Sequence, residues 1–186
     1  IDKTGFSERP AADRFRYIPF GDILPGDKGT LATCCYSTTL DPETGRYPVS
    51  DSYFAVSDDD GKTWREPVRI GNGDQNETTP LHLGNGEWVV AARTAKQAHL
   101  ELFRSNDNGS SWAFEQKLTL PSQHPAQLLK LQDDSILLTY GGRCRGHFGV
   151  YMRRSWDGGK TWDAPRHIKS YGDVDRGYPS TTQHAD

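Results

Sequence analysis

The sequence predicts an all-β protein assembled from repeated four-stranded units. Three observations support this prediction: a turn-rich composition, an octapeptide that occurs three times, and a strand–hairpin–strand segment that occurs twice. Of the 186 residues, 19 are Gly and 11 are Pro, while 11% are aromatic and 34% are hydrophobic. Many turn formers together with many aromatic residues are typical of short strands joined by tight turns, whereas disordered chains carry few aromatic side chains.

The octapeptide follows the pattern S-x-D-x-G-x-[ST]-W. Its three copies span residues 57–64, 105–112 and 155–162, with spacings of 48 and 50 residues. In each copy the Asp is placed to accept backbone N–H groups across a turn, and the Gly permits positive φ. The Trp is expected to fold back and bury its ring against a neighbouring strand. We interpret the octapeptides as structural turns rather than as sugar or calcium sites.

A second repeat lies between the octapeptides. Residues 78–93 read as strand, hairpin and strand, and residues 126–141 align with them at an offset of 48. Each period therefore holds about four strands, the content of one β-propeller blade. We predict blades at approximately 18–70, 76–121 and 124–170, with a fourth beginning at 177–186. Because propellers typically close with four to eight blades, residues 1–186 are expected to form a single partial β-propeller domain. The ring would be completed by the rest of a longer protein or by a partner chain.

Charge and hydropathy exclude several classes of partner. The chain has 22 Lys and Arg against 25 Asp and Glu, a formal net charge of −3, and no long basic run that would favour nucleic acid. Its apolar runs fall far short of the roughly 20 residues that span a membrane. The sequence shows no cluster of metal ligands and no glycine-rich phosphate loop, so we expect neither a metal nor a cofactor.

The three cysteines are Cys34, Cys35 and Cys144. Adjacent residues on a strand point to opposite faces of the sheet, so Cys34 and Cys35 are not expected to form a disulfide with each other. No pair has the C-x-x-C spacing of zinc or redox motifs. We expect buried small hydrophobic residues, with a disulfide at Cys144 as the alternative.

The octapeptide is similar to the Asp box of the sialidase superfamily, also called the bacterial neuraminidase repeat. The resemblance extends over nearly the whole chain, through Asn76-Glu77-Thr78, Ala91-Ala92-Arg93, His124-Pro125 and Gly177-Tyr178-Pro179-Ser180. It implies a β-propeller, six-bladed in that family, and an exo-glycosidase that removes terminal sialic acid or a related acidic sugar from glycans. It also implies an acidic glycan as partner and a secreted or periplasmic bacterial protein.

The resemblance further implies a set of site residues. Tyr178 matches the family's nucleophile and Glu77 its base, while Arg93 and Arg145 match arginines that grip the substrate carboxylate. A neutral Tyr hydroxyl suits this substrate, because an anionic nucleophile would be repelled by the sugar's carboxylate. Guanidinium groups can bind that carboxylate through two parallel hydrogen bonds. His124 begins its blade as Tyr178 begins the next, so it is expected to face the same axis. A contact with the substrate and a structural histidine with its hydrogen bonds satisfied are the two alternatives there.

Other positions depart from the family pattern. Residues 16–19 read Arg-Tyr-Ile-Pro and only approximate the family's R-I-P motif, in which a third arginine stands. Asp41 and Asp51 are the possible general acids, but their loop has no clear match, so no acid is assigned within the chain. Arg143 competes with Arg145 for the second clamp position. A glycosidase for a different sugar and a non-catalytic carbohydrate- or protein-binding propeller are the alternative functions.

Overall fold

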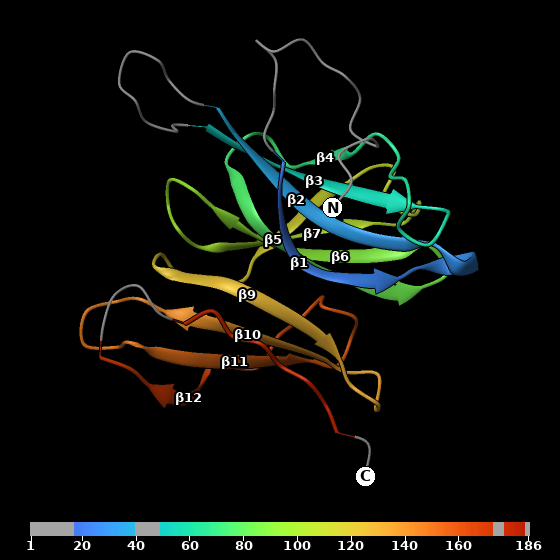
Figure 1. Ribbon diagram of the computed structural model, residues 1–186. Coiled ribbons are helices and arrows are strands. Elements are labelled where there is room, and N and C mark those ends of the chain that lie inside the picture. Colours follow the sequence, from blue (N-terminus) through green and yellow to red (C-terminus); the bar gives the residue numbers. More distant parts are fainter. Residues whose placement is uncertain (1–16, 40–48, 173–176, 185–186) are drawn as a thin grey trace.

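The computed structural model describes residues 17–39, 49–172 and 177–184, in which twelve strands form three four-stranded antiparallel sheets (Figure 1). The first sheet comprises β1 (Ile18–Pro25), β2 (Leu31–Thr39), β3 (Val49–Ser57) and β4 (Val68–Ile70). The second comprises β5 (Gln75–Gly84), β6 (Glu87–Thr94), β7 (Leu100–Ser105) and β8 (Ala113–Lys117). The third comprises β9 (Gln123–Lys130), β10 (Ile136–Gly142), β11 (Gly149–Ser155) and β12 (Arg166–Ser170). A 3-10 turn (Asp27–Gly29) joins β1 to β2. Strands that pair are consecutive in the chain, which confirms the predicted all-β fold of four-stranded propeller blades.

The sheets stack in chain order, and the first strands of the sheets, β1, β5 and β9, lie next to one another (Figure 1). One core fills the space between the first and second sheets and includes Phe54, Ile70, Trp88 and Phe103. A second core lies between the second and third sheets and includes Leu100, Leu102, Leu138 and Tyr140. The alternation of side chains along each strand supplies a face to each neighbouring sheet, so the second sheet is buried on both sides.

The three octapeptides form the turns that the sequence predicts. In the third copy, Ser155 Oγ accepts the Gly159 N–H (2.8 Å) and donates to Asp157 Oδ1 (2.9 Å). The carboxylate of Asp157 in turn accepts the hydroxyl of Thr161 (2.6 Å) and its N–H (2.8 Å). These hydrogen bonds lower the pKa of Asp157 to about 2. The rings of Trp112 and Trp162 pack against the cores, as expected.

The octapeptide turns of the second and third sheets each contact the preceding sheet. Arg104 donates through Nη2 to the carbonyl of Gly158 (2.8 Å), and Gln116 donates to the carbonyl of Gly159 (2.9 Å). Gly109 lies so close to the ring of Phe54 that an added Cβ would come within 2.3 Å of it. The turns therefore connect neighbouring sheets as well as neighbouring strands.

The cysteines are all free. Cys34 and Cys35 are buried in β2, which confirms the expectation of small hydrophobic residues for these two positions. Burial raises the pKa of the Cys35 thiol to about 12, and burial raises that of Cys34 as well. Cys144 is only partly buried and forms no disulfide.

The expected start of a fourth blade does not form a strand within residues 177–184. The segment lies along β9 and β10 through side-chain hydrogen bonds: Thr181 bonds to Gln127 and, at 2.9 Å, to Thr139, and Gln183 accepts the Gln132 N–H at 2.9 Å. That residues 1–186 make up one partial domain stays a prediction. In the part of the chain that the structure describes, no helix is long and apolar enough to cross a membrane.

Candidate active site

Glu77 and Arg93 meet at one end of the second sheet. The antiparallel register pairs Gln75 with Thr94 and Thr78 with Ala92, so two residues of β5, Asn76 and Glu77, oppose Arg93 alone. This is a β-bulge, an arrangement that redirects a side chain at the edge of a ladder. Arg93 Nη1 lies 2.6 Å from Glu77 Oε2, and both side chains are largely buried, at 21% and 13% exposure.

Tyr178 reaches the same carboxylate from the far end of the chain. Its hydroxyl donates to Glu77 Oε1 at 3.1 Å, so Arg93 and Tyr178 occupy different oxygens of one carboxylate. The Tyr178 side chain is 54% exposed, in contrast to its two partners. The site therefore has a buried ion pair at its base and an accessible phenol above it.

Two glycines permit this approach of Tyr178. A Cβ on Gly141 would come within 2.3 Å of the Gly177 carbonyl, so only glycine lets the chain before Tyr178 lie against β10. Gly177 itself has φ +89°, and a Cβ there would meet the hydroxyl of Tyr171 at 2.3 Å. Tyr171 is fixed in turn, because its hydroxyl donates to the Gly142 carbonyl at 2.9 Å. Backbone crowding and a left-handed φ thus set the position of Tyr178.

His124 lies in β9 at 4% exposure. Burial, followed by the positive charges of Arg93 and Arg143, lowers its pKa to about 3. Its Nδ1 has no hydrogen-bond partner among the residues that the structure describes. His124 is therefore a neutral imidazole close to the two arginines, and it is too buried to contact a substrate without a local movement.

The two candidate clamp arginines after β10 have different surroundings. Arg143 places its guanidinium carbon 5.1 Å from the centre of the Tyr178 ring, a cation–π distance. Arg145 is exposed in the loop between β10 and β11, and no hydrogen bond or ion pair joins it to another described residue. The structure thus brings Glu77, Arg93, Tyr178 and His124 together with Arg143, and it leaves Arg145 apart.

Arg143 was named from the sequence only as the competitor of Arg145. It follows two glycines at the end of β10, as Arg93 follows two alanines near the end of β6, and this small-small-Arg pattern favours it. Tyr36 was not singled out from the sequence. Tyr36 comes from β2 in the first sheet. Burial and the negative charge of Glu77, with a smaller effect of Tyr178, raise the pKa of Tyr36. No motif surrounds Tyr36, so the sequence held no signal for it.

Of the two candidate acids, Asp51 lies within the described residues. Asp51 accepts Nε of Arg69 at 2.8 Å and is committed to that ion pair. Asp41 and Arg16 lie outside the described residues. Within those residues, no group of three or more His, Cys, Asp or Glu side chains is arranged to hold a metal ion.

A family model described as a BNR repeat-like domain matches residues 21–186. The chain belongs to this BNR repeat-like family. Membership confirms the resemblance to the sialidase superfamily that the Asp boxes suggested. Among curated proteins, none matches the sequence.

Solved structures share the fold of the BNR repeat-like chain at low identity. A protein of unknown function from Dyadobacter fermentans superposes with a TM-score of 0.72 at 24% identity, over 88% of this chain and 45% of that one. An α-L-arabinofuranosidase from Fusarium graminearum superposes with a TM-score of 0.63 at 16% identity, over 87% of this chain and 52% of that one. The sialidase of Trypanosoma rangeli superposes with a TM-score of 0.58 at 15% identity, over 82% of this chain and 26% of that one. The chain therefore spans about half, or less, of the length of these proteins.

The geometry of this BNR repeat-like site permits one kind of chemistry in particular. A carboxylate that accepts a hydrogen bond from a phenol can remove its proton as the phenol oxygen attacks an electrophile. The guanidinium of Arg143 lies over the phenol ring, and that of Arg93 occupies the other oxygen of the same carboxylate.

Proposed function

We infer that the chain provides the nucleophilic half of a retaining exo-glycosidase that removes a terminal sialic acid or a related acidic sugar from glycans. The observation that carries this inference is the hydrogen bond from the Tyr178 hydroxyl to Glu77 Oε1 at 3.1 Å, with Arg93 on the other carboxylate oxygen. Membership of the BNR repeat-like family and a fold shared with glycosidases support it. The distinguishing claim is that the nucleophile is a Tyr.

The reaction takes place in two steps. Glu77 accepts the proton of Tyr178 as the phenol oxygen bonds to the anomeric carbon and the bond to the aglycone oxygen breaks. The aglycone departs as its anion and takes a proton from solvent, leaving a glycosyl–tyrosine. Water then attacks the anomeric carbon and gives one proton to solvent, while the bond to the Tyr178 oxygen breaks and the phenolate regains its proton from Glu77. Arg93 and Arg143 hold the sugar carboxylate during both steps.

The test uses the chain with its natural flanking sequence and an aryl α-sialoside. An aryl alcohol is a good leaving group, so its release depends little on a general acid and isolates the role of Tyr178. We expect Tyr178→Phe to abolish turnover, and Glu77→Gln to reduce kcat by about 10²–10⁴-fold, the usual contribution of a general base. In the unmodified protein, a 2,3-difluorinated sialic acid should add its glycosyl mass to the peptide that contains Tyr178.

Other outcomes would point to the alternative functions. Turnover that survives Tyr178→Phe would contradict the proposed nucleophile. No turnover by the folded protein, with sialic acid binding that Tyr178→Phe leaves intact, would indicate a binding propeller. Turnover of arabinosides but not sialosides would keep a glycosidase and change the sugar.

A further inference from the structure

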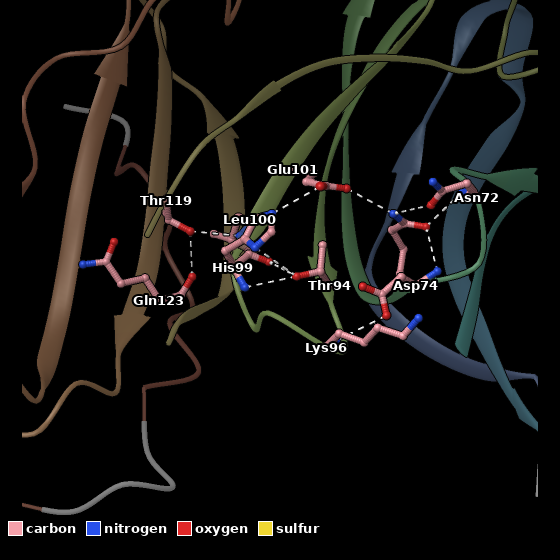
Figure 2. Close-up of polar contacts among 10 residues, drawn as sticks. Asn72, Asp74, Thr94, Lys96, His99, Leu100, Glu101, Thr119 and Gln123 are labelled. Carbon is pink, nitrogen blue, oxygen red and sulfur yellow. Dashed lines mark hydrogen bonds and ion pairs between the residues drawn. The ribbon is translucent and has the colours of Figure 1, made fainter. Parts of the chain in front are cut away.

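A buried polar network joins the loop before β5 to the ends of β6 and β7, and the proposed chemistry does not use it. Figure 2 shows its contacts running from Asn72 and Asp74, before β5, to Thr94 in β6, to His99 just before β7 and to Glu101 in β7. His99 is 3% exposed and Gln75 is 2% exposed. A buried polar group without a hydrogen-bond partner destabilises the folded protein. Such a network therefore holds its members in the one arrangement that satisfies them all.

His99 and Glu101 form the centre of the network. His99 Nε2 lies 3.2 Å from Glu101 Oε1, and His99 Nδ1 lies 3.2 Å from the hydroxyl oxygen of Thr94. An ionised carboxylate can only accept, so Nε2 is the donor in its contact with Glu101, and Nδ1 shares a hydrogen bond with the Thr94 hydroxyl. These contacts fix the orientation of the Glu101 carboxylate.

Gln75 connects that carboxylate to the backbone before Glu77. Its Nε2 donates to Glu101 Oε2 at 3.1 Å. Its Oε1 accepts the N–H groups of Asn72 and Asp74, each at 3.2 Å. One buried amide thus links β7 to the loop that leads into β5.

A second set of contacts holds the same loop from the turn after β6. The Asp74 carbonyl accepts the Ala95 N–H at 2.7 Å, and Asp74 Oδ1 accepts the Lys96 N–H at 3.3 Å (Figure 2). The residues that follow are held differently, because Asn76 and Glu77 form the bulge and have no ladder partner of their own. Asn76 Oδ1 accepts the Glu77 N–H at 2.7 Å, and the Glu77 side chain pairs with Arg93. The loop before the bulge is therefore one of the elements that set the position of Glu77.

We propose that His99 and Glu101 are positioning residues, which act through Gln75 to hold the bulge so that Glu77 faces the Tyr178 hydroxyl. Their catalytic consequence rests on the proposed function, whereas their effect on the bulge does not. The network thus determines how well Glu77 is aligned as a base for Tyr178, without touching the substrate.

The first variant is Glu101→Gln, which keeps the shape of the side chain. Its carbonyl oxygen can satisfy only one of the two donors, so its amide group must face the other, either His99 or Gln75. We expect amide hydrogen exchange of residues 71–77 to accelerate by about tenfold or more as the loop opens more often. We also expect kcat on the aryl sialoside to fall by up to about 10²-fold, the effect of a small misplacement, with KM nearly unchanged.

Exchanging the two side chains provides a rescue. In Gln75→Glu combined with Glu101→Gln, the new carboxylate accepts the N–H groups of the loop and the new amide donates to it. The carbonyl of the new amide accepts from His99. Net charge and side-chain volume equal those of the wild type. In this double variant we expect amide hydrogen exchange at residues 71–77 to be nearly as slow as in the wild type, and most of the wild-type kcat to be restored.

Glu115→Gln is the matched control. Glu115 also forms an ion pair in the second sheet, with Arg104 at 2.9 Å, but at the opposite end of β7 from Glu101. Its substitution should leave exchange at residues 71–77 at the wild-type rate, even if it lowers the thermal midpoint of unfolding.

Hydrogen exchange separates this proposal from the proposed function. If Glu101→Gln leaves exchange at residues 71–77 unchanged, or if the double variant exchanges as fast as the single one, the positioning role is refuted. If exchange responds as expected but the wild type does not cleave any sialoside, the positioning role stands and the proposed function fails. An equal loss of kcat in Glu115→Gln would show general destabilisation and would also refute the proposal.

Discussion

The neutral His124 gives this protein a specific response to acid. Its pKa of about 3 in the folded state lies below the ordinary value of 6.5. Between these two pH values the unfolded chain binds a proton that the folded chain excludes, so the free energy of unfolding falls as the pH falls through this window. Above pH 6.5 both states hold a neutral imidazole and the effect vanishes.

We expect His124→Gln to make the free energy of unfolding less dependent on pH between 6.5 and 4. One titrating group contributes at most about 1.4 kcal/mol per pH unit. Urea unfolding at pH 7, 5.5 and 4.5, in wild type and variant, measures the difference in slope. Identical slopes in the two proteins would mean that His124 accepts a proton in the folded state as readily as in the unfolded state.

Arg143 and Arg145 can be distinguished by paired substitutions in one loop. Because Arg143 lies over the Tyr178 ring, we expect Arg143→Ala to raise KM for an α-sialoside by about 10–100-fold, the usual effect of losing a charge-assisted hydrogen bond. Arg145→Ala should have a smaller effect, since its side chain is exposed and apart from the site. Steady-state kinetics of both variants test this order. A larger effect of Arg145→Ala would indicate that Arg145 binds the substrate carboxylate, as the family pattern suggests.

The sequence could predict part of this residue group and not the rest. Glu77, Arg93 and Tyr178 stand in short motifs that match the family pattern, and Glu77 and Arg93 lie near the ends of strands that pair with each other. Tyr36 is brought in by packing between the first two sheets, which leaves no local pattern that could be read before the fold is known. The sequence left Arg143 and Arg145 as competitors, and the course of their loop places Arg143 at the site.

At the scale of single elements, the octapeptide turns depend on one buried hydroxyl each. Ser105 is 1% exposed, and its Oγ accepts the Gly109 N–H at 2.9 Å and donates to Asp107 at 2.7 Å. The Gly109 N–H is buried together with the Phe54 ring, so water cannot replace the lost acceptor. The serine that opens the octapeptide is thus as important to the turn as the aspartate that gives the Asp box its name.

We expect Ser105→Ala to destabilise the protein by about 1–3 kcal/mol, the cost of leaving a buried donor unsatisfied. Ser110→Ala in the same turn is the control, because Ser110 donates to the Asp107 carbonyl from an exposed position. Chemical denaturation of both variants, with unchanged slopes against denaturant, measures the difference. Equal stability of the two variants would show that the Ser105 hydroxyl is dispensable.

The bulge in β5 is a feature of a single strand that the sequence did not predict. Alternation and turn residues predicted a strand, a hairpin and a second strand over residues 78–93. The extra residue at Asn76 and Glu77 is visible only in the pairing register, where Gln75 meets Thr94 and Thr78 meets Ala92. That one-residue insertion decides the direction of Glu77, and no composition rule reports it.

At the scale of the whole molecule, the repeat period predicted the number and order of the sheets. A spacing of 48 to 50 residues leaves room for four short strands, and three octapeptides gave three sheets. The period could not predict the course of residues 177–184, because hydrogen bonds from Gln127 and Gln132 hold this segment without pairing it as a strand. Its place depends on contacts that have no counterpart earlier in the chain.

The joints between the sheets differ in chemistry although they occupy equivalent positions. The joint between the second and third sheets is polar, with Arg104 donating to the Gly158 carbonyl, whereas the joint between the first and second is an aromatic ring against Gly109. The residue before the octapeptide serine is Val56 in the first copy and Arg154 in the third, so the arginine is not a fixed part of the repeat. The two contacts therefore respond differently to the solvent. Concentrated sulfate would strengthen the packing of Phe54 against Gly109, because sulfate favours the burial of apolar surface, and would screen the ionic contacts around Arg104.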